Sequence, residues 1–358
     1  MKTRKGLIMK AMKRQLRNVL LPGVITTLVL GATALKAQVV PAVPSSPISP
    51  AAPPRPPRPP RSPRPPHAPR SWFGSNEGVA KIDTVIPFSS TGTVDLSLLS
   101  GAIKLSTWDR NEVRVFASTT GEPSLQFDAT GSRISLEQAS SGRWNLKNED
   151  NRNTATFEVT VPIGARAMLS AVSGSIDVSG LRGTVDVSSW SGAVDVRDVG
   201  SSLTVHGVSG RITATNIAKD ARVENMSGSI SVNGVGGTLS AETVSGTIAI
   251  AGVRGDQVHA TSVSGSIDFS GPVGASARYE FQTISGRTDL KLASNANASV
   301  SVETFSGSIS NGYPGAVRVR NSDPDDDQKT FRYAIGRGEG RVRVEAFSGT
   351  VHISQGNP

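Results

Sequence analysis

The sequence predicts an all-β fold, a right-handed β-solenoid similar to a β-roll, with about 18–21 residues and two short strands in each coil. Three observations predict this fold. A nine-residue pattern runs through the middle of the chain, every second unit carries Ser-Gly, and nothing after the N-terminal segment shows the 3.6-residue period of an amphipathic helix. A repeat of this regularity is typical of a stack in which each coil contacts only its neighbours.

The nine-residue units begin at Val172, and their positions 1, 5 and 7 are apolar or small. Positions 5 and 7 lie two residues apart, so their side chains point to the same face of a strand. We expect all three positions to line a thin core. Trp190 replaces an aliphatic residue at position 1, and we expect it in the core rather than in a binding surface. The position 1 residues are Val172, Leu181, Trp190, Val199, Val208, Ile217, Met226, Val235 and Val244.

The Ser-Gly units define one corner of the coil. Glycine at a repeated corner indicates a positive φ or a close approach of two backbones. Because only alternate units carry the motif, the coil consists of two unlike half-coils. The last motif, at Gly349, follows Gly307 by 42 residues and is interpreted as two further steps of 21. The motif glycines are Gly174, Gly192, Gly210, Gly228, Gly246, Gly265, Gly286, Gly307 and Gly349.

The N-terminal segment has the features of an export signal. Basic residues precede an apolar stretch from Val19 to Ala34, which is shorter than the ~20 residues of a membrane-spanning helix. Residues 1–37 are therefore predicted to be a signal peptide, with an uncleaved signal-anchor as the alternative. Export would place the protein in the periplasm, in the outer membrane or on the surface of a bacterium.

The remaining chain divides by composition into three parts. Residues 38–78 form a linker rich in proline and arginine, which favours an extended polyproline II spacer. Its arginines could also dock on anionic envelope polymers or lipids. Residues 79–162 are predicted to be an N-terminal β-strand region of the solenoid domain. Residues 163–354 are predicted to be the regular solenoid, with an inserted acidic loop near 312–330.

Charge and cysteine content exclude several classes of protein. Residues 1–70 hold 13 Lys or Arg and no acidic residue, which leaves 25 basic against 29 acidic residues in the remainder. The folded part is thus mildly acidic, whereas a nucleic-acid-binding module would carry its basic excess on the fold. The chain has no cysteine, so disulfides, thiol catalysis and cysteine-based metal sites are excluded.

Carboxylates at position 6 of the Ser-Gly units are the strongest candidates for chemistry. The repeat places Asp177 beside Asp195, and Asp268 beside Asp289, on neighbouring coils. Paired carboxylates of this kind could cleave glycosidic bonds. Water-facing strands carry aspartate in any case, and no basic cluster lies in register with these residues. We therefore predict no catalytic residue.

Metal and cofactor sites are not predicted. Calcium-binding β-rolls need Gly-Gly-x-Gly-x-Asp turns, and the turns that begin at Gly180 and Gly234 lack the aspartate. The acidic run from Asp323 to Asp327 is typical of a solvated loop. The histidines are isolated in the sequence and lack metal-ligand spacing: His206, His259 and His352.

Three separate blocks of sequence resemble a known family. They are Ser106-Thr-Trp-Asp-Arg-Asn-Glu-Val-Arg-Val, Val161-Pro-Ile-Gly-Ala-Arg, and the tail that begins Tyr333-Ala-Ile-Gly-Arg-Gly-Glu-Gly. Together they resemble the putative-adhesin β-strand-repeat family, a bacterial domain-of-unknown-function family, over roughly residues 80–354. The resemblance implies an exported β-solenoid of the cell envelope. It implies no catalytic or binding residue.

The leading hypothesis is a non-enzymatic envelope or surface protein, an adhesin or scaffold that presents a rigid binding face on a proline spacer. Its expected partner is a glycan, a lipopolysaccharide or a protein of the envelope, with membrane association through the N-terminal segment or the arginine-rich linker. Trp72 and Trp144 are the candidate exposed aromatic contacts. The alternatives are an envelope-stress sensing module that binds a membrane partner and a carbohydrate-active β-helix enzyme.

Overall fold

The computed structural model describes residues 81–120, 124–139, 154–319 and 329–356. It divides the chain into the units Met1–Trp72 and Phe73–Pro358, and all the described residues belong to the second. The predicted signal, the proline-rich linker, Trp72, Trp144 and the run Asp323 to Asp327 lie outside the described residues. The described part of the chain is all-β, as predicted, with twenty strands hydrogen-bonded into one continuous sheet.

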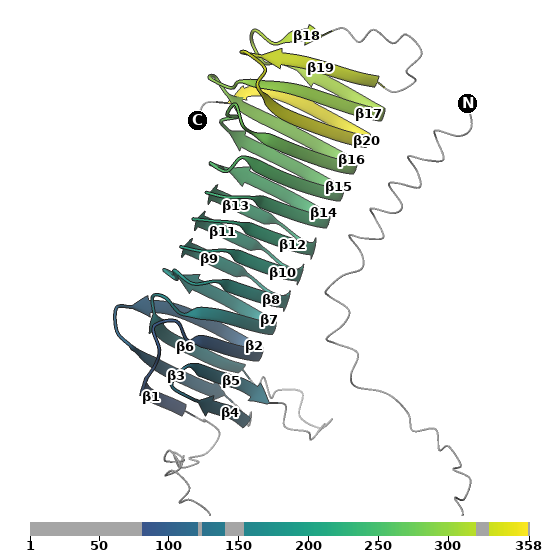
Figure 1. Cartoon of the computed structure of the whole chain (residues 1–358). Coiled ribbons are helices and arrows are strands. Elements are labelled where there is room, and N and C mark those ends of the chain that lie inside the picture. Colours follow the sequence, from purple (N-terminus) through teal and green to yellow (C-terminus); the bar gives the residue numbers. More distant parts are fainter. Residues whose placement is uncertain (1–80, 121–123, 140–153, 320–328, 357–358) are drawn as a thin grey trace, which may run out of the picture. The chain divides into compact units, whose positions relative to one another are not determined.

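The middle of this unit is a regular solenoid of stacked strands (Figure 1), and the strand pairings give it an 18-residue step. Val185 pairs with Leu203, and Leu203 pairs in turn with Ala221, all in parallel register. The second strand of each coil follows the same rule, since Ile212 pairs with Ile230. The handedness of the coil stays a prediction. The strands are β7 (Arg166–Ser179), β8 (Val185–Ser191), β9 (Val194–Val199), β10 (Leu203–Ser209), β11 (Ile212–Ile217), β12 (Ala221–Ser227), β13 (Ile230–Val235) and β14 (Leu239–Ala251).

The C-terminal coils depart from sequential order. Gly349 pairs with Gly286 on one side and with Gly307 on the other, so β20 lies between β16 and β17. The interpretation of Gly349 as two steps beyond Gly307 is therefore wrong. Strand β19 pairs antiparallel with both β17 and β18, and the chain then re-enters the stack as β20. The strands are β15 (Gln257–Gly271), β16 (Arg278–Ala293), β17 (Ala298–Asn311), β18 (Val317–Val319), β19 (Lys329–Ile335) and β20 (Gly340–Gly356).

The N-terminal end adds one rung that the repeat analysis missed. Gly101 in β2 pairs with Gly174 in β7, so Ser100-Gly101 continues the corner ladder. Gln138 stands beneath this rung and accepts hydrogen bonds from the backbone N–H groups of Leu99 and Ser100. Strands β5 and β6 pair with the two halves of β2. The strands are β1 (Lys81–Pro87), β2 (Thr93–Trp108), β3 (Glu112–Thr120), β4 (Ser124–Ala129), β5 (Arg133–Ala139) and β6 (Thr154–Pro162).

Positions 5 and 7 of the repeat form the core, as predicted. From Ile176 to Ile250, every residue at these positions is at most 2% exposed. Strand alternation explains this, because the two positions share one face of the sheet and that face is turned inward. Position 1 is buried in one half-coil and faces outward in the other, and the outward residues form the candidate site.

The corner glycines allow the coils to stack. Gly228 has φ of 121°, and a Cβ at this position would lie 2.0 Å from the carbonyl oxygen of Gly210 on the preceding coil. Residues other than glycine rarely adopt such a φ, and no neighbouring side chain can relieve a clash with backbone. Glycine is therefore required at this corner for both conformational and steric reasons.

We predict that Gly228→Ala lowers the free energy of unfolding by at least about 2 kcal/mol, because it combines backbone strain with a backbone clash. Gly131→Ala is the matched control, since a Cβ at Gly131 would meet nothing within 4 Å. Urea unfolding followed by circular dichroism measures both variants. Equal stabilities would contradict the close approach at the corner.

A second pair of variants tests which residues of β13 face inward. Ile230 is fully buried, whereas its neighbour Ser231 is half-buried on the outer face. We predict that Ile230→Asp lowers the melting temperature severely, because it buries an unpaired charge. Ser231→Ala should change the free energy of unfolding by no more than ~0.5 kcal/mol. Similar melting temperatures for the two variants, measured by calorimetry, would contradict the orientation of this strand.

Candidate functional site

Position 1 of the Ser-Gly half-coils points outward instead of into the core. Val172, Trp190 and Met226 are 45%, 48% and 47% exposed. The expectation that Trp190 lies in the core is therefore wrong, as is the assignment of all position 1 residues to one buried wall. In the other half-coil the expectation is confirmed, since Leu181 and Ile217 are at most 1% exposed.

A single residue per half-coil explains this difference. Before each buried position 1 residue stands a residue with positive φ, such as Asp198 and Asn216, both at 56°. A left-handed residue interrupts the alternation of the strand, so the next side chain returns to the core. No such residue precedes Trp190, where alternation continues without a break: Val187 is buried, Ser188 exposed, Ser189 buried and Trp190 exposed.

The outward residues form a continuous apolar row, which we call the corner ridge. Each member stands directly before a Ser-Gly pair, and the pairing of those serines and glycines places successive members on adjacent coils. Ten members separated by ~4.8 Å make a row about 43 Å long. In stacking order the ridge is Leu99, Val172, Trp190, Val208, Met226, Val244, Val263, Ile284, Phe347 and Phe305.

An aromatic pair stands at one end of the ridge. Phe305 and Phe347 are 52% and 42% exposed, and their rings stack with centroids 5.0 Å apart and an interplanar angle of 5°. The register of β17 with β20 brings these residues together although 42 positions separate them. This juxtaposition depends on the displaced last coil, and nothing in the local sequence signals it.

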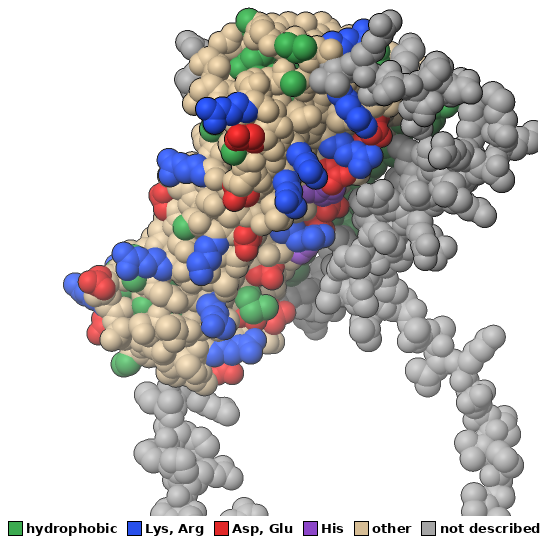
Figure 2. All heavy atoms as spheres, turned by 45° about the horizontal axis from the view of Figure 1, so that its top comes forward, with side chains coloured by type: hydrophobic (Ala, Val, Ile, Leu, Met, Phe, Trp, Pro, Cys, Tyr) green, Lys and Arg blue, Asp and Glu red, His purple; other side chains and the backbone are tan. Residues whose placement is uncertain are grey.

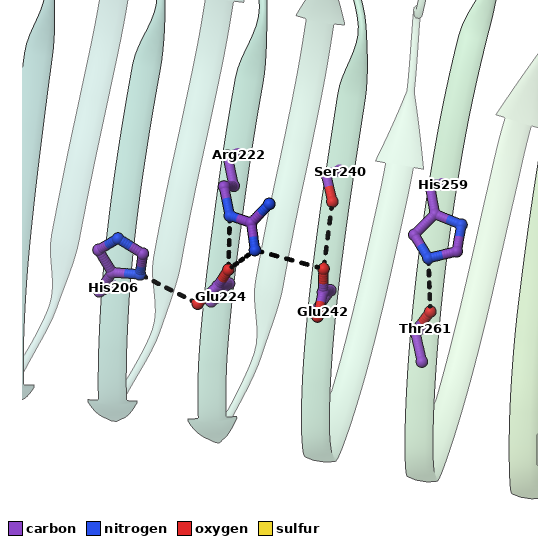
Figure 3. A network of polar contacts seen from close by, with 7 residues as sticks. All are labelled: His206, Arg222, Glu224, Ser240, Glu242, His259 and Thr261. Atoms are coloured by element: carbon purple, nitrogen blue, oxygen red, sulfur yellow. Dashed lines mark hydrogen bonds and ion pairs between the residues drawn. The ribbon is translucent and has the colours of Figure 1, made fainter. Parts of the chain in front are cut away.

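A network of charged and polar side chains lies on the outer face of the stack (Figure 3). Its residues stand two or four positions before members of the ridge on the same strands, so they lie next to the ridge. The Nδ1 atom of His206 is 3.1 Å from Oε2 of Glu224 on the next coil. Arg222 donates a 2.6 Å hydrogen bond from Nε to Glu224, and its Nη2 lies 3.8 Å from Oε1 of Glu242. Histidines that are isolated in the sequence therefore meet carboxylates from neighbouring coils. Figure 2 shows basic and acidic side chains close together along this part of the surface, with histidine among them.

The ionisation of His206 and Glu224 is coupled. The hydrogen bond that His206 donates to Glu224, together with the negative charge of Glu224, raises the pKa of His206 above 6.5 against an opposing effect of burial. The same hydrogen bond, aided by Arg222, lowers the pKa of Glu224 below 4.5. Both shifts favour the charged pair in the folded protein.

The predicted aspartate pairs are neighbours, as expected. Asp177 pairs in register with Asp195, and Arg197 forms ion pairs with both carboxylates, at 4.0 Å from Asp177. Asp268 pairs in register with Asp289, and burial and the charge of Asp289 raise the pKa of Asp268. Within the described residues, no three His, Asp or Glu side chains converge as metal ligands would.

The family comparison identifies what the fold resembles. Residues 93–354 match the Toastrack DUF4097 family. This match confirms the resemblance to an adhesin-like domain-of-unknown-function family. No protein of curated function is significantly similar to the chain. The described part of the chain contains no helix of the length and hydrophobicity that a membrane crossing requires.

Several solved structures align with the chain at low identity. A putative adhesin from Bacteroides fragilis NCTC 9343 aligns over 78% of this chain and 98% of its own, with 10% identity and a TM-score of 0.34. A putative cell adhesion protein from Clostridium sporogenes ATCC 15579 covers 77% and 100%, with 9% identity and a TM-score of 0.21. A putative lipid binding protein from Parabacteroides distasonis ATCC 8503 covers 78% and 97%, with 13% identity and a TM-score of 0.27. At these scores the structures carry no argument about the site.

We predict that the contribution of His206 to stability depends on pH. Its folded pKa lies above the unfolded value of 6.5, so the stabilisation is complete below pH 6.5 and is lost as the pH rises through the folded pKa. His206→Gln should therefore be less stable than the wild type by up to about 1 kcal/mol near pH 5.5, and by less at pH 8.5. Urea unfolding at the two pH values measures this difference, and Glu224→Gln should abolish the same pH dependence. A difference that grows with pH would contradict the His206–Glu224 interaction.

Proposed function

The chain belongs to the Toastrack DUF4097 family, and we propose that its solenoid is a non-enzymatic binding scaffold of the cell envelope. In this proposal the corner ridge is the binding surface, and the predicted export signal and proline-rich spacer present it outside the cytoplasm. The partner is a component of the envelope or of a cell surface. The aspartates serve as solvated, structural side chains, since Asp177 and Asp195 form ion pairs with Arg197.

One observation carries the proposal: at six of the ten corners a polar residue is buried while the apolar residue that follows it faces outward. Alternation alone would allow the reverse arrangement if the strand shifted by one residue. The six pairs are Ser189 and Trp190, Asn225 and Met226, Thr243 and Val244, Ser262 and Val263, Thr283 and Ile284, and Thr304 and Phe305.

This arrangement lowers the stability of the protein. The hydroxyls of Ser189, Ser262, Thr283 and Thr304 have no hydrogen-bond partner among the described residues. A buried hydroxyl without a partner costs about 1–3 kcal/mol. The exposed side chains of Trp190, Met226 and Phe305 forgo much of the about 1.5–3 kcal/mol that full burial contributes, and the half-buried Val244, Val263 and Ile284 forgo a smaller part. A contiguous apolar surface kept outside at this cost indicates a binding site rather than a solubility feature.

The ridge also has the shape of a binding surface. Its members come from strands joined to neighbours on both sides, so their positions are fixed before a partner binds. A preordered surface avoids much of the entropic cost of association. Repetition along the stack further allows an elongated partner to contact several coils at once.

We predict that Trp190→Ser/Met226→Ser reduces binding to envelope material by about tenfold or more, because large exposed apolar side chains dominate such interfaces. The measurement is retention of solubilised envelope fractions, and of an array of surface glycans, on the immobilised protein. Met168→Ser is the control, since Met168 is 47% exposed on β7 but lies outside the ridge. Equal retention by the ridge variant and the wild type would overturn the proposal, as would the absence of any binding by the wild type.

A further inference from the structure

The corner ridge has a chemically distinct half. From β12 to β17 the column of outward residues next to the ridge, which we call the acidic column, holds four glutamates together with Thr261 and Gln282. From β2 to β8 the same column holds serines, Ser97, Ser170 and Ser188. We propose that the half from Met226 to Phe305 binds a cationic amphipathic polypeptide segment, whose apolar row contacts the ridge while its flanking Lys or Arg side chains meet the acidic column. This inference rests on the proposed role of the ridge as a binding surface.

The charge balance of this half favours a cationic partner. Six strands contribute a ridge residue here, and on each strand the residues two and four positions earlier share its outward face. Among these twelve outward residues there are five carboxylates, two guanidinium groups and the imidazole of His259. The carboxylates are Glu224, Glu242, Glu280, Glu345 and Glu303, and the guanidinium groups are those of Arg222 and Arg343.

The excess of negative charge is concentrated beside the aromatic pair. Arg343 lies 3.2 Å from Glu303 and also contacts Glu345, so one guanidinium group serves two carboxylates. Glu280 stands in register with Arg343 on the adjacent strand, accepts a 2.8 Å hydrogen bond from Gln282 and lies 3.6 Å from Nδ1 of His259. Burial, together with the negative charges of Glu303 and Glu280, raises the pKa of Glu345 against the attraction of Arg343. A basic side chain from a partner would relieve this repulsion.

The same features argue against other occupants. A second copy of the chain would place acidic columns near one another, and like charges across an interface oppose association. A bilayer rich in anionic lipid would meet like charge along the same column. A neutral polymer would leave the acidic column unused.

The dimensions of the half-ridge suit a short helix. Its six rungs span about 24 Å, which corresponds to about 16 residues of α-helix. A helix presents an apolar residue on one face at every turn of ~5.4 Å, close to the ~4.8 Å between rungs. Basic residues on one flank of that apolar row would lie over the acidic column, where they also speed association at low salt.

The test uses the purified protein and a fluorescently labelled 18-residue helical peptide made of leucine and lysine, with its leucine–glutamate counterpart as the control peptide. Fluorescence anisotropy should show binding of the lysine peptide that weakens with salt. Phe305→Ser/Phe347→Ser should weaken binding about tenfold or more. Glu303→Gln/Glu345→Gln should weaken it roughly fivefold and flatten the salt dependence. Glu158→Gln, an exposed carboxylate on β6, should leave binding unchanged.

Several results would overturn this inference without affecting the proposed function. One is envelope capture that needs Trp190 and Met226 while the lysine peptide fails to bind. Another is equal binding of the two peptides, or binding that the Glu303→Gln/Glu345→Gln variant leaves unchanged although thermal unfolding shows it to be folded. Preferential binding to phosphatidylglycerol vesicles over the peptide would assign the half-ridge to a membrane instead.

Discussion

The backbone contact between corner glycines is the constraint on which the rest of the structure depends. At each Ser-Gly corner the backbones of successive coils approach so closely that a Cβ would lie about 2 Å from a carbonyl oxygen of the coil before, as at Gly192 and Gly246. This contact fixes the register of both half-coils at once. Every other column of the solenoid, buried or exposed, inherits its alignment from this one.

Because the coils stack in register, each column of the solenoid repeats the same type of side chain from one coil to the next. A single outward apolar residue on a strand is unremarkable, but its repetition on successive coils produces a continuous ridge. Carboxylates repeated on successive coils would repel one another, and arginine side chains placed among them reduce this repulsion. Arg197 lies against Asp177 and Asp195, Arg222 between Glu224 and Glu242, and Arg343 between Glu303 and Glu345. Each of these guanidinium groups serves two carboxylates, so compensation is incomplete, and next to the aromatic end of the ridge the proposed partner would add to it.

The sequence predicts the repeat well and the exposure of position 1 poorly. Apolar residues at positions 5 and 7 predict burial directly, because they share one face of a strand. The spacing of the Ser-Gly glycines predicts the number of residues in each coil. The direction of position 1 depends on whether the preceding residue has positive φ. Gly180, Asp198 and Asn216 have it and Gly207 does not, although glycine and asparagine also occur before exposed members of the ridge. Composition alone therefore does not separate the two half-coils.

Other features escape prediction because they join distant segments. The Ser100-Gly101 rung repeats the motif of the later coils, but 73 residues separate Gly101 from Gly174, so the regular period does not reach it. The insertion of β20 between β16 and β17 depends on pairing across the β18 and β19 excursion, which no local pattern encodes.

The insertion of β20 between β16 and β17 sets the order of the aromatic residues along the ridge. If the coils followed one another in chain order, Phe305 would lie on the coil after Ile284, and Phe347 would lie beyond it. The observed order instead places Phe347 between Ile284 and Phe305, with Glu345 between Gln282 and Glu303. The displaced coil thus joins a stacked aromatic pair to adjacent carboxylates at one end of the ridge. Because the aromatic pair and these carboxylates lie on the same two strands, β20 and β17, we expect apolar contact and charge selection by the proposed partner to act at the same end of the ridge.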